Sequence, residues 1–278
     1  MKNIILIFIL FIQVVPAQNK RFVYQYTFIP DSTNKANVVK ELMILDVTND
    51  RSMFFSQRKY ISDSTIIAPS NKGKFIMPPA DLNILYRIEK KDGKTYFESM
   101  GNFALMKIKV EDDRKMDWKI LGDKQKILNF NTQRASLDFA GREWIAWFTP
   151  DIPFQDGPYK FHGLPGLIVK IEDATKSHAY ELIGIINLPN EYSYPERYQN
   201  VKEREFTLME FKKYYLQGRS DPGAGERQLY MEGKIPDQRD SSGNFRTGAE
   251  IVREVEQLAK ERIKKDNNII ELDLIREK

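Results

Sequence analysis

Hydrophobic and polar residues alternate along the first two thirds of the chain. Residues 21–28, RFVYQYTF, place an aromatic side chain at every second position, which is typical of a strand that buries one face. Residues 84–100, ILYRIEKKDGKTYFESM, contain two alternating runs joined at Asp92-Gly93, a strong sequence signal for a tight β-hairpin. Short strands separated by turns predict an antiparallel meander rather than an alternation of strands and helices.

The last third of the chain has a helical pattern instead. Two Thr-x-x-Glu capping boxes, beginning at Thr207 and Thr247, each precede a run with apolar residues at helical spacing. We expect the first helix to end at Gly218, because glycine is common just after a helix. Turn-rich stretches between the two helices predict loops, and residues 268–275, NIIELDLI, predict a last strand.

These patterns predict a mainly β fold in a single β-rich domain over residues 18–278. Strands dominate residues 18–188, and helices and loops dominate residues 189–278. We expect a large curved antiparallel meander, a half-barrel similar to the periplasmic lipoprotein carriers, with the C-terminal helices packed on it. A closed β-barrel or a two-sheet sandwich is the alternative.

The N-terminal residues 1–17 have the organisation of a signal peptide. Lys2 provides a positive charge, residues 4–12 are continuously apolar, and Val15-Pro16-Ala17 fits a signal-peptidase site. The alternative, a buried core helix, is less consistent with this position and flank. We therefore expect an exported protein, periplasmic or extracellular after cleavage. No second apolar run is long enough to span a bilayer, so the mature chain is expected to have no transmembrane segment.

Composition excludes several functional classes. The chain has no cysteine, which removes disulfides and thiolate metal sites. Its formal net charge is only +4 and the charges are interspersed, whereas nucleic-acid-binding proteins concentrate basic residues on one face. We therefore expect no nucleic acid partner. Neither a phosphate-binding loop nor a serine on a glycine elbow is present, so we expect no cofactor and assign no catalytic residue.

Residues 141–173, GREWIAWFTPDIPFQDGPYKFHGLPGLIVKIED, hold the densest grouping of prolines and glycines beside an apolar strand pattern. Proline prevents regular strand pairing, and glycine permits backbone conformations that other residues avoid. The segment predicts a loop of defined shape from residue 150 to 166 that leads into a strand at Leu167. The residues of this structural motif are Gly163, Leu164, Pro165, Gly166, Leu167 and Ile168.

The stretch GPYKFHGLPGLI, residues 157–168, resembles the signature of the GLPGLI family of exported Bacteroidetes proteins. That family is named after the six residues found here at 163–168. Residues 140–153, AGREWIAWFTPDIP, and residues 22–28, FVYQYTF, are similar to the family's style as well. The resemblance extends to about residue 188. It implies export and a shared fold, but it implies no activity, because the family lacks an established biochemical role.

The two histidines, His162 and His178, are the candidates for metal binding, with Asp151 and Asp156 as oxygen ligands near His162. Their spacing matches no ligand motif, so we favour a hydrogen-bonded loop histidine at 162 and an exposed histidine at 178, and expect no metal. Asp151 and Asp156 are also candidates for paired catalytic carboxylates. Aspartate beside proline or glycine more often stabilises a turn.

Aromatic residues near the central segment are the candidates for ligand binding, since such side chains line pockets and partner surfaces. Alternating aromatic residues in a β meander also bury one another, and the core is the interpretation that we favour. The candidates are Trp118, Trp144, Trp147, Tyr159, Phe161 and His162.

The function expected from the sequence is that of a non-enzymatic exported protein of the cell envelope. It would bind an apolar or extended ligand, such as a peptide, or a protein partner, for example an outer-membrane transporter. Export, the aromatic content and the missing catalytic motifs favour this hypothesis. The alternative is a metal-dependent hydrolase, or a metal-binding accessory protein, that uses His162 and nearby carboxylates.

Overall fold

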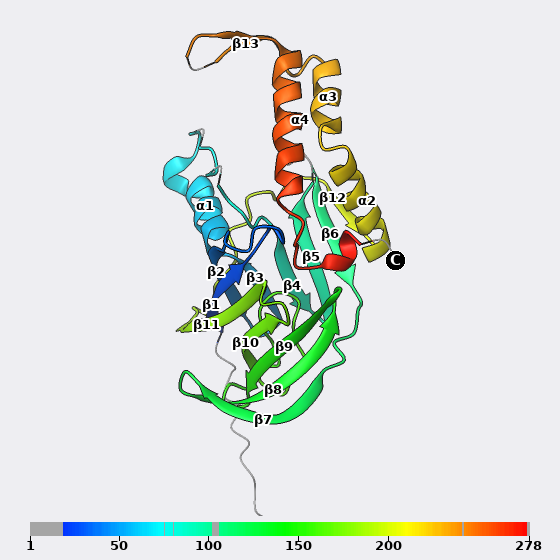
Figure 1. Ribbon diagram of the computed structural model, residues 1–278. Helices are drawn as coiled ribbons and strands as arrows, with labels where there is room; N and C mark the ends of the chain where they lie inside the picture. Colours follow the sequence, from blue (N-terminus) through cyan, green and yellow to red (C-terminus); the bar gives the residue numbers. More distant parts are fainter. Residues whose placement is uncertain (1–18, 75, 80, 102–105, 241, 277–278) are drawn as a thin grey trace, which may run out of the picture.

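The computed structural model describes residues 19–74, 76–79, 81–101, 106–240 and 242–276 (Figure 1). Its centre is a curved sheet of 12 strands in the order β12-β6-β5-β4-β3-β2-β1-β11-β10-β9-β8-β7. Neighbouring strands are antiparallel, apart from the parallel pair β12 and β6. Within the described residues the two end strands, β7 and β12, are not paired with each other. The mainly β meander is therefore confirmed, and the closed barrel and the two-sheet sandwich are wrong.

The elements of the first half are β1 (Lys20–Phe28), β2 (Val39–Val47), β3 (Arg51–Ser56), α1 (Gln57–Ile67), the short 3-10 helix η1 (Pro69–Asn71), β4 (Arg87–Lys91), β5 (Lys94–Met100), β6 (Lys107–Asp112), β7 (Lys119–Ile127) and β8 (Phe130–Phe139). Those of the second half are β9 (Arg142–Thr149), β10 (Leu167–Asp173), β11 (His178–Asn187), β12 (Glu203–Phe206), α2 (Leu208–Ser220), α3 (Ala224–Met231), β13 (Gln238–Arg239), β14 (Phe245–Arg246), α4 (Gly248–Lys264) and the 3-10 helix η3 (Leu272–Leu274).

One face of the sheet, called the inner face here, carries the hydrophobic core. Strand register places Phe22 of β1 beside Leu45 of β2, then Phe54 of β3 and Ile88 of β4. All four side chains are fully buried. Burial of a large apolar side chain contributes about 1.5–3 kcal/mol, so the period-two pattern read from the sequence supplies much of the stability of the sheet.

Residues 150–166, which connect β9 to β10 and are called the central loop, pack against the inner face. Tyr159, Phe161 and Leu164 are buried there, with the Phe161 ring 4.7 Å from that of Trp144. The inner face is therefore filled largely by the protein's own loop. That leaves little room on it for the apolar ligand expected from the sequence.

The helices lie around the upper part of the sheet in Figure 1. Helix α2 packs through Phe211 against Ile108, Val110 and Phe206, and α3 and α4 lie side by side. Both predicted capping boxes are confirmed, at Thr207 and Thr247. None of the described helices has both the length and the apolar character needed to cross a membrane. The expected signal peptide, residues 1–17, lies outside the described residues.

Four details of the helices and strands predicted from the sequence are wrong. Helix α2 continues past Gly218 to Ser220, and α3 forms within a stretch that we expected to be a loop. Helix α1 was not predicted, because its two buried residues are Ser62 and Asp63 and it therefore lacks an apolar stripe. Residues 268–275 contain η3 rather than a strand, since their backbone bonds go to separate loops instead of to a ladder.

Candidate functional site

The central loop is attached to strand β4 by Lys90. The Lys90 ammonium donates hydrogen bonds to the Asp156 carboxylate, to the carbonyl of Gly157 at 2.9 Å and to that of Phe161 at 3.1 Å. Burial lowers the pKa of Lys90, while Asp156 acts in the opposite direction. Because all three ammonium hydrogens have acceptors, Lys90 holds the loop in place rather than offering a free amine.

Backbone geometry completes the shape of the loop. Asp156 and His162 face each other in a short antiparallel bridge, and the Trp118 indole N–H donates to the His162 carbonyl at 2.8 Å. Gly166 has φ +139°, and a Cβ there would lie 2.0 Å from the Thr149 carbonyl oxygen. Only glycine fits this position. These observations support the sequence-based interpretation of the motif as a backbone device.

A row of polar side chains crosses the inner face at the end nearest the central loop. Register pairs Val47 with Ser52, Ser52 with Lys90, and Lys90 with Thr95. The Ser52 side chain is almost enclosed, with 4% of its surface exposed. Its hydroxyl has no hydrogen-bond partner in the described part of the protein. An enclosed hydroxyl without a partner costs about 1–3 kcal/mol, so it marks a place where a polar group from a ligand or solvent is expected.

Ser52 is one of the residues that line a hollow of about 260 Å³, called the polar hollow here. Its inner wall is the polar row, and the central loop forms the opposite wall with Gln155, Asp156 and His162. The tip of the β4–β5 hairpin provides the rim. The full lining is Val47, Thr48, Asp50, Arg51, Ser52, Lys90, Lys91, Asp92, Gly93, Lys94, Thr95, Gln155, Asp156 and His162.

His162 is held in one orientation within this wall. Its Nδ1 lies 2.8 Å from the Lys160 carbonyl oxygen, and a carbonyl can only accept, so Nδ1 carries a hydrogen. Burial and the neighbouring Lys90 ammonium lower the pKa of His162 below 6.5. The ring is therefore neutral at pH 7, with its acceptor at Nε2. No described residue donates to that nitrogen.

The charges around the polar hollow largely compensate one another. Asp156 is paired with Lys90 and also accepts from the Gly157 amide at 2.7 Å. On the rim, Arg51 pairs with Glu89 at 2.9 Å and Lys94 pairs with Glu111 at 2.9 Å. What the hollow offers a ligand from its buried wall is therefore mainly the Ser52 hydroxyl and His162 Nε2.

A buried charge cluster fastens the middle of the central loop, at Tyr159 and Lys160, to the C-terminal segment. Lys160 Nζ lies 2.7 Å from an Asp112 oxygen and 2.5 Å from a Glu271 oxygen. Arg114 bridges the same two carboxylates, and the Tyr159 hydroxyl donates to Glu271. The Lys160 and Arg114 charges keep the pKa of Asp112 well below 3.8 despite its burial. Tyr159 also has φ +54°, a strained conformation for a bulky residue, which these contacts hold in place.

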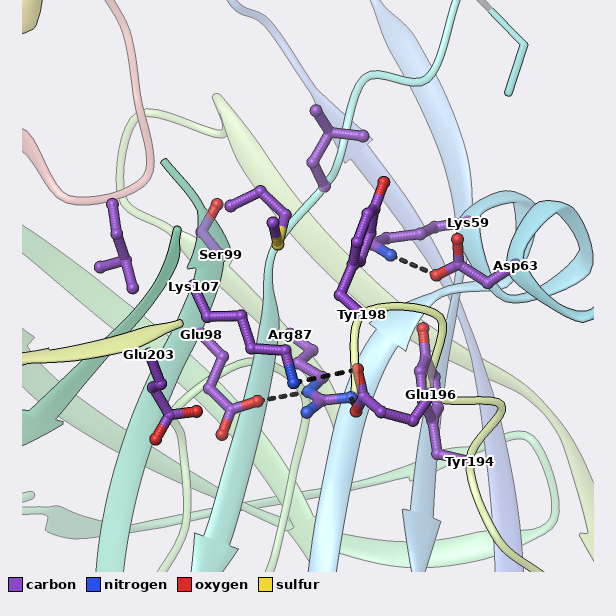
Figure 2. A pocket seen from close by; sticks show the side chains of 13 residues that line it. Lys59, Asp63, Arg87, Glu98, Ser99, Lys107, Tyr194, Glu196, Tyr198 and Glu203 are labelled. Carbon is purple, nitrogen blue, oxygen red and sulfur yellow. Dashed lines mark hydrogen bonds and ion pairs between the residues drawn. The ribbon is translucent and has the colours of Figure 1, made fainter. Parts of the chain in front are cut away.

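Figure 2 shows a second hollow, a charged crevice on the opposite face of the sheet, covered by residues 188–202. It is small, about 40 Å³. Arg87 lies between Glu98 and Glu196, and Lys107 approaches Glu196 at 3.3 Å. These charged groups are partners of one another, so a ligand would first have to break their ion pairs. The polar hollow is the better candidate site, because the Ser52 hydroxyl and His162 Nε2 have no hydrogen-bond partner in the part of the chain that the structure describes.

The candidates from the sequence fall into three sets. Trp144, Tyr159 and Phe161 are buried in the core, whereas Trp118 and Trp147 lie partly buried at its margin. His162 and Asp156 both line the polar hollow.

Asp151 does not share this site. Its carboxylate accepts instead from the backbone N–H of Asn131 at 3.2 Å. In the described residues, no three acidic or histidine side chains are grouped as metal ligands. Within the motif, Leu164, Leu167 and Ile168 belong to the core, and Pro165 lies between Leu164 and the constrained Gly166. His178, expected to be exposed, is instead buried, because the C-terminal segment covers it and accepts from its ring through the Asn268 carbonyl.

Sequence reasoning missed Ser52, Lys90 and Thr95. The hairpin signal did place Lys90 and Thr95 opposite each other across Asp92-Gly93. However, Ser52 joins them through the pairing of β3 with β4, which are separated by α1 and a long connection. No local signal in the sequence indicates that pairing.

Comparison with known proteins finds a match to one family model over part of the chain and a similar fold among solved structures. Residues 97–170 match the model of a family described as protein of unknown function (Porph_ging), a region that includes the central loop. No curated protein matches the chain. Two crystal structures of PNGF-II, in space groups P21 and C2, are similar with TM-scores of 0.51 and identities of 18% and 17%.

Each PNGF-II alignment covers 73% of this chain but 34% of the PNGF-II chain. The protein thus spans about a third of PNGF-II, and at this identity the likeness shows the fold alone.

Proposed function

We propose that this chain is a non-enzymatic exported protein of the cell envelope that binds a small polar ligand in the polar hollow. The observation that carries the proposal is the enclosed Ser52 hydroxyl, which has no partner among the described residues and belongs to a residue that lines the same hollow as His162. The inner face is filled by the central loop, so the polar hollow replaces the apolar groove expected from the sequence as the binding site.

The arrangement favours recognition over catalysis. A serine nucleophile needs a base within hydrogen-bond reach, yet Ser52 and His162 share no hydrogen bond. Lys90 has donated all its ammonium hydrogens, and Asp156 is paired with it. The alternative of a metal-dependent hydrolase is weaker, because Asp151 lies outside the polar hollow and Asp156 is already paired with Lys90.

Export is the second part of the proposal and rests on residues 1–17. In the periplasm or outside the cell, the protein would meet envelope components, and a partner in the outer membrane fits that location. Expression of the full chain in its host followed by mass measurement tests this part. We expect a mature protein that begins at Gln18 in the envelope or external fraction. A full-length protein in the cytoplasm would contradict it.

Binding is tested by ligand-observed NMR with glycerol, acetamide, acetate, phosphate and methylammonium as probes. At least one probe is expected to bind the wild type, and Ser52→Ala is expected to weaken it. Ser62→Ala is the matched control, because Ser62 is also buried with an unpartnered hydroxyl but lies on α1 outside the hollow. If none of the probes binds, or if both variants behave alike, the proposal fails. Hydrolysis of p-nitrophenyl acetate that Ser52→Ala abolishes would contradict the non-enzymatic part.

A further inference from the structure

We infer that the ligand of the polar hollow is uncharged and presents a hydroxyl or a primary amide to His162 Nε2 and the Ser52 hydroxyl. This inference rests on the proposed function and specifies the chemistry of its ligand. It follows from which hydrogen-bonding groups the protein has left unoccupied and from the charges that surround them.

His162 is the first of the two recognition groups. Because Nδ1 is used by the Lys160 carbonyl, the neutral ring can only accept a hydrogen bond at Nε2. The charged groups that act on the ring electrostatically are Lys90 from β4, Asp156 from the central loop and Asp112 from β6. Burial and the Lys90 ammonium disfavour a proton on the ring more than the two carboxylates favour it, since the pKa of His162 is lowered. The ligand must therefore supply the hydrogen.

Ser52 is the second recognition group. Its hydroxyl can donate or accept, and it has no partner in the described residues. A ligand group that donates to His162 and accepts from Ser52 satisfies both. A hydroxyl donates and accepts through the same oxygen, and a primary amide donates through its nitrogen and accepts through its oxygen.

Charged ligands fit this pair less well. A carboxylate only accepts, so it would force a proton onto His162 beside the Lys90 ammonium. Inorganic phosphate retains a hydrogen near pH 7, but it would bring its negative charge into the hollow that the Asp156 carboxylate lines. An ammonium group only donates and would meet that same cation. The hollow's volume of about 260 Å³ suits a small molecule or the end of a larger one. An uncharged group at this position leaves every ion pair of the rim intact.

The sign of the pH dependence tests the inference. Glycerol, acetamide, acetate, phosphate and methylammonium are each titrated into the ¹⁵N-histidine-labelled protein while the His162 ring is followed by NMR. Glycerol or acetamide is expected to bind. Because only the neutral ring accepts, affinity should fall tenfold per pH unit below the pKa of His162 measured in the same experiment. By linkage, saturation with the probe should lower that pKa. The glycerol and acetamide arms distinguish a hydroxyl ligand from an amide ligand.

Two variants separate this role from a structural one. Ser52→Ala is expected to weaken glycerol or acetamide binding, whereas Ser62→Ala is expected to leave it unchanged. His162→Gln keeps an uncharged acceptor near the position of Nε2, so binding is expected to persist without its pH dependence. Loss of binding in Ser62→Ala as well would overturn the inference, because the effect would then not be specific to the hollow.

The possible failures are distinguishable. If acetate or phosphate binds and raises the pKa of His162, or if methylammonium alone binds, the inference is wrong and the hollow remains a binding site. If none of the five probes perturbs His162, both the inference and the proposed function are wrong.

Discussion

Mild acid is expected to destabilise this protein through His178. The ring is 1% exposed. Its Nε2 lies 2.9 Å from the Asn268 carbonyl, and its Nδ1 lies 2.6 Å from the Tyr26 hydroxyl. Since the carbonyl can only accept, Nε2 carries the hydrogen and Nδ1 accepts from Tyr26. A second proton on the ring would remove that acceptor and place a charge near the Arg142 guanidinium in the core.

The magnitude follows from the difference between the folded and unfolded pKa values. Burial, and then the Arg142 guanidinium, lower the pKa of His178 from 6.5 to about 4 in the folded protein. As the pH falls below 6.5, the unfolded chain takes up the proton first, so the free energy of unfolding decreases until the folded pKa is reached. The loss is about 1.4 kcal/mol per pH unit inside this window, or about 2 kcal/mol between pH 7 and pH 5.

This pH range separates the histidine effect from that of the buried carboxylates. The pKa of Asp173, which accepts from the His178 amide, lies below its ordinary value of 3.8. A carboxylate with a lowered pKa contributes stability that is lost only as the pH falls through and below its unfolded value. Asp173 therefore keeps its contribution at pH 5, and a decrease measured down to that pH belongs to the histidines.

Urea-induced unfolding at pH 7 and pH 5 measures the effect. The wild type is expected to lose at least the roughly 2 kcal/mol that His178 accounts for, since the lowered pKa of His162 acts in the same direction. His178→Gln is expected to be less stable at pH 7 but to lose less than half as much on acidification. His162→Gln, which removes the other histidine, keeps most of the loss. Where His178→Gln does not fold, an NMR titration of the wild-type ring replaces it, with an expected pKa of about 4. Titration of His178 near pH 6.5 in the folded protein would refute the reasoning.

Two further predictions concern the central loop and are measured by urea unfolding at pH 7. Gly166→Ala is expected to cost more than about 3 kcal/mol, because its Cβ would overlap the Thr149 carbonyl. Gly163→Ala is expected to cost only about 1 kcal/mol, because Gly163 has φ +91° but open space around the added Cβ. Equal losses in the two variants would contradict the backbone argument. Lys160→Met is expected to cost about 3–5 kcal/mol, because it removes one of the two cations that compensate the buried carboxylates of Asp112 and Glu271 and leaves only Arg114. Lys94→Met removes an exposed ion pair and is the near-neutral control. A loss for Lys160→Met as small as the control's would mean that the cluster does not hold the loop.

The parts of the fold predicted from the sequence are those set by neighbouring residues. The hairpin at Asp92-Gly93 formed as expected, with both residues at positive φ, because that dipeptide fits the turn on its own. The capping boxes at Thr207 and Thr247 depend on residues three positions apart. The bend before Leu167 was predicted from its own glycines and proline, although the contact that requires glycine at 166 is with Thr149 at the other end of the central loop.

The candidate site could be predicted only in part, because it is assembled from distant segments. His162 and Asp156 were found through their residue types and the loop that carries them. Ser52 was not, since nothing in RSMFFS distinguishes a buried serine that faces a hollow from one that packs in a strand. Its importance depends on the pairing of β3 with β4 and on the position of the central loop. His178 was misplaced for a similar reason, because Asn268 covers it from the far end of the chain.

The buried charge of Lys90 has a role in the site that an apolar residue of similar size could not fill. Replacement of a buried ion pair by hydrophobic residues is often neutral for stability, so an ion pair here indicates a requirement beyond stability. The Lys90 ammonium binds both ends of the segment from Asp156 to Phe161 and thereby fixes the backbone that carries His162. Burial and the same charge lower the pKa of His162 and keep its Nε2 available as an acceptor. Lys90 thus fixes the position, and helps to set the protonation state, of the group on which recognition in the polar hollow depends.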